Sequence, residues 1–246
     1  MNKIQNTVRH SSTSFEMTKT TYAAAVINIW SICIAFAQDS PTASPSPTPE
    51  PTRSPSSARN VRLSFVPPPA EGTISLGIFD AEGKLVRVLH REAKIEYITV
   101  DADSLKTTWN GKNDAGEDLP AGKYRARGYL AEDHLNVNDL GKATEPPGDA
   151  SDHLMINLEM NPLESDTRSV VDIAVGFDAN GSFLKTMDGL PLRTISGTLN
   201  VVRASITKNG ERSADVWLDN GVAVEQFRVS DIDKMMAFDC GDFELK

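Results

Sequence analysis

Hydrophobic and polar residues alternate in short runs through the middle of the chain. Glycine, proline and aspartate residues separate these runs, and no stretch keeps the roughly 3.6-residue period of an amphipathic helix over several turns. The first alternating positions are Val61, Leu63, Phe65, Ile74, Leu76 and Ile78. Short alternating runs bounded by turn residues are typical of antiparallel sheets. The pattern therefore predicts an all-β fold, with a β-sandwich over about residues 60–132.

A polar stretch, residues 133–153, interrupts the pattern, and its Pro-Pro-Gly-Asp at 146–149 predicts a connector. Alternation resumes in residues 154–246, where Asn-Gly pairs at 180–181, 209–210 and 220–221 predict hairpin turns. We expect a second small antiparallel β domain there. As an alternative, the runs at 169–183 and 214–229 resemble strand pairs of partial β-propeller blades. The second half has room for about two blades, fewer than the roughly four of a closed ring.

The N-terminal segment, residues 1–37, resembles an export signal. Residues 22–37 are uncharged and mostly apolar, Lys3, Arg9 and Lys19 precede them, and the segment ends in Ala35-Phe36-Ala37. A basic region, an apolar region and small residues at the end are typical of a cleaved signal peptide. The alternative is an uncleaved N-terminal anchor. Either way we predict a secreted, periplasmic or cell-surface protein.

Residues 38–59 are rich in proline, serine and threonine. Such a composition buries too little apolar surface to offset the entropy of ordering, so we predict a disordered linker. Its prolines favour an extended polyproline II spacer, which would hold the following domain away from a membrane or wall.

The net charge of −9 narrows the range of partners. Nucleic acids and anionic membrane surfaces attract proteins with basic patches, so we expect no nucleic-acid partner. Contact with a membrane is expected only through the N-terminal segment if that segment stays uncleaved. The partner is left open, as an unknown protein or glycan of the cell envelope or outside it.

The stretch WNGKNDAGEDLPAGKY, residues 109–124, mixes turn formers with acidic residues. Glycines suit turn positions with positive φ, Asn113 and Asp114 can fold onto nearby backbone N–H groups, and Trp109 can fill the sandwich core. A Ca²⁺ loop built from Asn113, Asp114, Glu117 and Asp118 is the alternative. It lacks the spacing and the distal glutamate of a known calcium loop. We therefore predict a structural corner.

Together with residues 75–92, this stretch resembles the immunoglobulin-like module of the flagellar hook-capping (FlgD-type) family, which also occurs in many secreted bacterial proteins. The hairpin part of the resemblance rests on Ile78, Phe79, Asp80, Gly83, Leu85 and Val86. The corner part rests on Trp109, Asn110, Gly111, Asn113, Gly116, Leu119, Pro120, Gly122 and Tyr124. The resemblance implies an Ig-like β-sandwich over about residues 60–132, in which these corner residues are structural.

Motifs for catalysis are missing from the sequence. It contains no G-x-S-x-G, H-E-x-x-H, C-x-x-C or nucleotide-binding glycine loop, so we expect no catalytic residues, no cofactor and no metal. Weaker alternatives are a metal site at His134 and His153 with neighbouring aspartates, and a carboxylate pair at Glu117/Asp118 or Asp231/Asp233. Cys240, alone after signal cleavage, is expected to be a buried, unreactive thiol.

These observations predict an exported, non-enzymatic module that presents an Ig-like sandwich on a stalk. Its binding surface is expected to be shallow, with Trp217 or exposed loops of the second domain as candidate contacts. One alternative is an accessory or truncated part of a secreted hydrolase or carbohydrate-active protein. Another is a flagellar hook-assembly scaffold.

Overall fold

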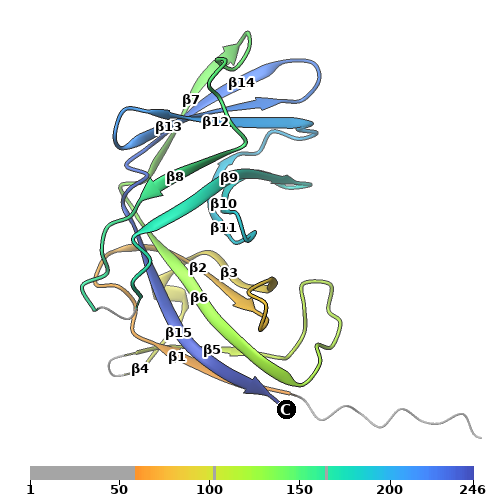
Figure 1. Ribbon diagram of the computed structural model, residues 1–246, viewed down its shortest axis with the longest axis vertical. Coiled ribbons are helices and arrows are strands. Elements are labelled where there is room, and N and C mark those ends of the chain that lie inside the picture. The colour runs from red at the N-terminus through yellow and green to blue at the C-terminus, as the bar shows by residue number, and fades with distance from the viewer. Residues whose placement is uncertain (1–58, 102–103, 164–165) are drawn as a thin grey trace, which may run out of the picture. The chain divides into compact units, whose positions relative to one another are not determined.

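The computed structural model describes residues 59–246, except 102–103 and 164–165 (Figure 1). The predicted signal or anchor (1–37) and the linker up to residue 58 lie outside the described residues. The described chain consists of strands β1 to β15 and one 3-10 turn, η1, so the all-β prediction is confirmed. The strands form antiparallel sheets, and two groups of these sheets make two lobes.

The first lobe is a sandwich of a three-stranded sheet, β1-β5-β4, and a four-stranded sheet, β15-β6-β2-β3. Its elements are β1 (Val61–Phe65), β2 (Gly72–Phe79), β3 (Leu85–Lys94), η1 (Ile95–Tyr97), β4 (Thr99–Asp101), β5 (Ser104–Trp109), β6 (Gly122–Glu132) and β15 (Met235–Leu245). The core between the sheets contains Ile74, Leu76, Ile78, Leu105 and Trp109. The alternating positions read from the sequence thus face this core.

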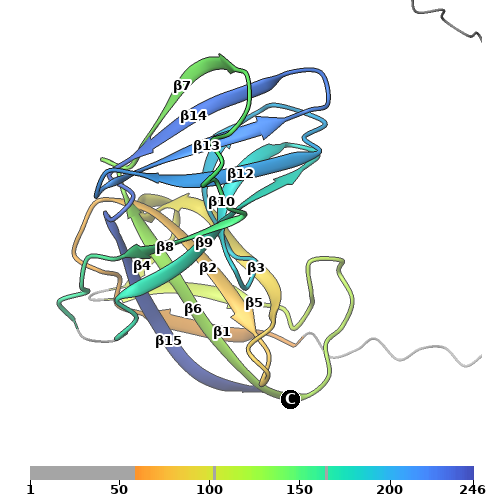
Figure 2. The same ribbon diagram turned by 45° about the horizontal axis from the view of Figure 1, so that its top comes forward.

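The last strand of the chain belongs to this first lobe. β15 pairs with β6 from Met235↔Ala131 to Leu245↔Gly122, and the two strands lie side by side in both views (Figures 1 and 2). The sequence pattern had assigned these residues to a second domain spanning 154–246. Local alternation identifies a strand but not its distant partner, which is why the pattern missed this pairing. The second lobe is therefore inserted between β6 and β15.

The second lobe consists of two four-stranded sheets, β11-β10-β9-β8 and β12-β13-β14-β7. Its strands are β7 (Asn136–Ala143), β8 (His153–Asn157), β9 (Val170–Asp178), β10 (Gly181–Thr186), β11 (Pro191–Ser196), β12 (Arg203–Asn209), β13 (Ser213–Asp219) and β14 (Val224–Ser230). Residues 136–143 had been read as part of a polar connector, but β7 pairs with β14 along its length. β7 is almost entirely exposed, so it lacks the apolar alternation by which a strand is recognised.

One hydrophobic core joins the second lobe to the first. It contains Ile173 and Leu184 from one sheet of the second lobe, Val216 from the other, and Phe79 and Tyr129 from the first lobe. The sheet β15-β6-β2-β3 is thus covered on both faces, by the sandwich core on one side and by the second lobe on the other. This arrangement explains why almost every residue of β2 is buried.

Candidate functional site

The corner at residues 109–124 is held by its own side chains. The Trp109 ring is 1% exposed and lies edge-on to Tyr124 and Phe243, with ring centroids 5.1 and 5.8 Å apart. Its indole Nε1 donates a hydrogen bond to the Lys112 carbonyl, 2.9 Å away. The tryptophan therefore closes the end of the sandwich core and fixes the start of the loop.

Two glycines and a tyrosine shape the rest of the corner. Gly111 and Gly116 have φ of +73° and +82°, a conformation that side chains with a Cβ rarely adopt. The Tyr124 hydroxyl donates to the Pro120 carbonyl at 2.8 Å. This bond ties the first residues of β6 to the loop before them, as a tyrosine corner does in a β-sandwich.

The polar side chains of the loop have partners within the protein. The Asn113 amide donates to the Glu117 carboxylate at 2.8 Å. Asp118 pairs with Lys112 at 3.1 Å and Asp114 with Arg87 at 3.4 Å. Within the described ranges, no group of three or more His, Cys, Asp or Glu residues is placed to hold a metal ion. The geometry is that of a cross-linked turn.

We therefore expect Ca²⁺ to leave the stability of this corner unchanged. The melting temperature of the protein should be the same in millimolar CaCl₂ and in EDTA, because the carboxylates already have protein partners. Thermal unfolding followed by circular dichroism measures this. A melting temperature that rises with Ca²⁺ and loses that rise in Asp114→Asn would assign the loop to calcium.

The other candidates from the sequence are dispersed. Asp231 and Asp233 both pair with the Arg212 guanidinium, at 2.7 and 3.1 Å, so each carboxylate has an arginine partner. His153 contacts its neighbour Asp152, with Nδ1 and Oδ1 2.9 Å apart. Burial raises the pKa of Cys240 to about 12, which keeps its thiol protonated.

Trp217 differs from its predicted role. It was a candidate contact residue, but the residue is 6% exposed, so its ring is not available as a platform for a ligand. It lies in β13 between neighbours on β12 and β14, opposite Ser205 and Gln226. A sequence does not show whether a tryptophan in a strand is covered by its surroundings.

Three arginines line the boundary between the lobes, and each combines an aspartate partner with an aromatic ring. We call these residues, Arg91, Arg127 and Arg168 with Asp178, Asp188 and Asp166, the arginine seam. Arg91 pairs with Asp178 at 3.1 Å and lies over Phe183, 4.2 Å from the ring centroid. Arg127 pairs with Asp188 at 2.8 Å and lies over Phe79, 4.1 Å from the centroid.

Arg168 makes the most extensive contacts of the seam. It follows β8 in the loop that leads to β9, and its guanidinium binds Asp166 through Nε at 2.9 Å and Nη2 at 2.5 Å. It also donates to the Tyr129 hydroxyl at 3.0 Å and to the Phe238 carbonyl at 3.0 Å, both in the first lobe. This loop of the second lobe is therefore fastened to β6 and β15.

Sequence reasoning did not single out the seam. A signal was present in β6, where Arg125 and Arg127 alternate with Tyr124 and Ala126 on a strand whose other residues are mostly apolar. Arginine on a strand with little solvent exposure implies a partner for its charge. That partner, Asp188 for Arg127, lies on a distant loop and is not visible in the local pattern.

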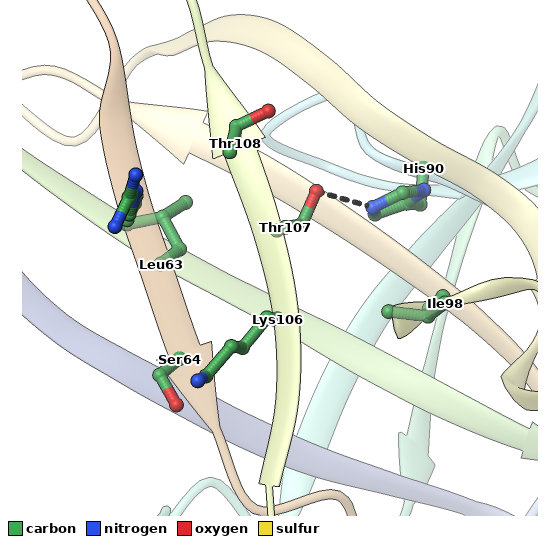
Figure 3. Close-up of a pocket in the computed structure, with 8 residues that line it drawn as sticks. Leu63, Ser64, His90, Ile98, Lys106, Thr107 and Thr108 are labelled. Atoms are coloured by element: carbon green, nitrogen blue, oxygen red, sulfur yellow. Dashed lines mark hydrogen bonds between the residues drawn. The ribbon is translucent and has the colours of Figure 1, made fainter. Parts of the chain in front are cut away.

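A groove of about 450 Å³ opens on the first lobe (Figure 3). It is lined by Arg62, Leu63 and Ser64 of β1, Lys106, Thr107 and Thr108 of β5, His90 of β3, and Ile98. The His90 Nε2 and Thr107 Oγ1 atoms lie 2.9 Å apart, as the dashed line in Figure 3 marks. Burial lowers the pKa of His90, which favours the neutral imidazole. None of the candidate sites inferred from the sequence includes these residues.

Within the part of the chain that the structure describes, no helix is long and apolar enough to cross a membrane. No family model matches the sequence, and no curated protein matches it either. Two crystal structures of truncated FlgD from the human pathogen Helicobacter pylori, one from strain 26695, are similar at 13% identity. The similarity covers 72% of this chain and 80% and 79% of those chains, with a TM-score of 0.25 in both cases. At that score the likeness carries no argument about fold or function.

Proposed function

We propose that this chain is a non-enzymatic structural and binding module that works outside the cytoplasm. The observation that carries the proposal is the arginine seam, together with the return of β15 to the first lobe. Both features fasten two lobes into one body. A body of this kind suits a protein that holds two surfaces in a fixed relation for a partner.

The seam is suited to rigidity because its contacts are directional. A guanidinium is planar and donates several hydrogen bonds in a fixed fork, so it specifies an angle as well as a distance. Arg168 uses its fork on a carboxylate, a phenol hydroxyl and a backbone carbonyl at once. Stacking on an aromatic ring adds to each arginine's contacts without loosening this geometry.

The N-terminal sequence supports a location outside the cytoplasm. Residues 1–37 have the pattern of an export signal, and residues 38–59 have the composition of an extended spacer. A rigid two-lobed body on such a spacer would project from a membrane or wall, or be released from it after cleavage.

A reporter fusion tests export. Alkaline phosphatase fused after Lys246 folds only in an oxidising compartment, so the full chain should give an active reporter and a variant lacking residues 1–37 should not. The purified protein should also show no turnover on glycan and ester substrates. Equal reporter activity with and without residues 1–37 would contradict export, and reproducible turnover would favour the hydrolase alternative.

A flagellar hook scaffold is the second candidate, and the motif at residues 75–92 and 109–124 supports it. A strain without this chain should then lose hooks, as seen by electron microscopy of its surface. Normal hooks in that strain would end this alternative and leave the general module.

A further inference from the structure

The groove of Figure 3 lies where one strand of the first lobe stops. β4 pairs with β5 only at Ser104, Leu105 and Lys106, so Thr107 and Thr108 lie past the end of that neighbour. His90 of β3 approaches from this side, and Ile98 lies where the chain turns into β4. The groove therefore runs from the face of β1 and β5 over the edge of β5.

The charge of the groove is opposite to that of the whole protein. The chain carries −9, but the described residues that line this groove include the exposed Arg62 and no carboxylate. Within the described residues, the Arg62 guanidinium has neither a hydrogen bond nor an ion pair. An arginine without a protein partner at the rim of a groove is available to bind an anion with its fork.

The remaining lining favours a ligand with many hydroxyl groups. The Ser64 hydroxyl donates to Ser104 Oγ at 3.0 Å and the Thr107 hydroxyl pairs with His90, so each of these oxygens keeps a lone pair that can accept, and the Thr108 hydroxyl can donate and accept. Leu63 and Ile98 also line the groove, but they are 5% and 4% exposed, so the polar side chains carry most of the contact with a ligand. The volume of about 450 Å³ falls within the range of small-molecule sites.

We propose that this groove binds an anionic saccharide, with Arg62 on a carboxylate and the threonine and serine hydroxyls on the hydroxyl groups of the sugar. An acidic peptide offers the carboxylate but few hydroxyl groups, so it would leave most of the lining without partners. The inference goes beyond the proposed function, because it concerns one groove of the first lobe and holds whether or not the chain is exported.

Isothermal titration of the full chain with trigalacturonate tests the proposal. We expect saturable binding, weakened about tenfold or more by Arg62→Ala, because a hydrogen bond to a charged group is lost. Arg203→Ala, which removes an exposed arginine of the second lobe, should bind as the unchanged protein does. Methyl-esterified trigalacturonate should bind about tenfold more weakly as well, since it lacks the charge.

Three binding results would overturn the proposal. These are no binding of trigalacturonate at millimolar concentration, equal binding by Arg62→Ala, and tighter binding of pentaglutamate than of the saccharide. Amide chemical shifts provide the location: the shifts caused by trigalacturonate should be largest at Thr107 and Thr108. Shifts confined to the second lobe would place the saccharide elsewhere and also overturn the assignment.

Discussion

Replacement of Trp109 by alanine should lower the free energy of unfolding by about 3–5 kcal/mol, the cost of truncating a large aromatic residue in a core. The ring is 1% exposed and contacts Tyr124 and Phe243 edge-on. Its removal leaves a cavity between the two sheets of the first lobe and frees the Lys112 carbonyl from its indole partner. Urea denaturation followed by far-UV circular dichroism measures the change.

Two conservative variants separate the causes of this loss. Trp109→Phe keeps an aromatic ring in the core but removes the indole N–H, so it should cost clearly less than the alanine variant. Tyr124→Phe removes only the hydrogen bond to the Pro120 carbonyl and should cost about 1 kcal/mol. If Trp109→Ala cost no more than Tyr124→Phe, the tryptophan would not be a core residue and the structural reading of the corner would be wrong.

The fold class was predictable because period-2 alternation is a local property. Val61, Leu63 and Phe65 show it, and all three lie on the inner side of the first lobe. The burial of the other face of β2 could not be predicted from local alternation. Ser75 and Gly77 look like solvent-facing positions between Ile74, Leu76 and Ile78, yet they are buried because the second lobe covers them.

Gly77 shows why a buried position on this face resembles an exposed one in the sequence pattern. A Cβ at that position would come within 2.6 Å of the Leu85 side chain and 3.1 Å of the Leu190 side chain. A small residue is needed where two lobes approach closely, and small residues look polar or neutral in a hydrophobicity pattern. Interfaces between lobes are therefore harder to read from sequence than the core of a sandwich.

The candidate sites also differ in whether their residues are neighbours in the sequence. The corner at 109–124 could be predicted because its turns, glycines and aromatic residues are neighbours in the sequence. The groove and the arginine seam draw residues from strands and loops far apart in the chain. Arg168 and Tyr129, for example, are 39 positions apart, and Arg168 and Phe238 are 70 apart. Their charges were visible, but not their partners.

Replacement of Arg168 by alanine should destabilise the protein by about 3–5 kcal/mol, toward the lower end because the arginine is not fully buried. The Asp166 side chain is 4% exposed and the Arg168 side chain 25% exposed. Without the guanidinium, a nearly buried carboxylate loses its counterion, and the Tyr129 hydroxyl and the Phe238 carbonyl lose a donor. Urea denaturation measures the cost.

A matched arginine gives the control for this experiment. Arg203 pairs with Asp219 at 3.4 Å, but its side chain is 63% exposed, so Arg203→Ala should change stability by no more than about 1 kcal/mol. Arg168→Lys keeps the charge but not the planar fork, so it should recover only part of the loss. Equal costs for the Arg168 and Arg203 variants would show that the seam adds no more than a surface ion pair.

The double variant Arg168→Ala, Asp166→Ala distinguishes pairing from simple loss of contacts. If the main cost is an unpaired buried carboxylate, removal of both partners should cost less than the sum of the single variants. Amide hydrogen exchange should then show where the loss acts: protection should fall first in β15, whose Phe238 carbonyl accepts from Arg168. Unchanged exchange in β15 alongside a large loss of stability would mean that Arg168 stabilises only its own loop, and the two lobes would then be joined by β15 and the shared core rather than by the seam.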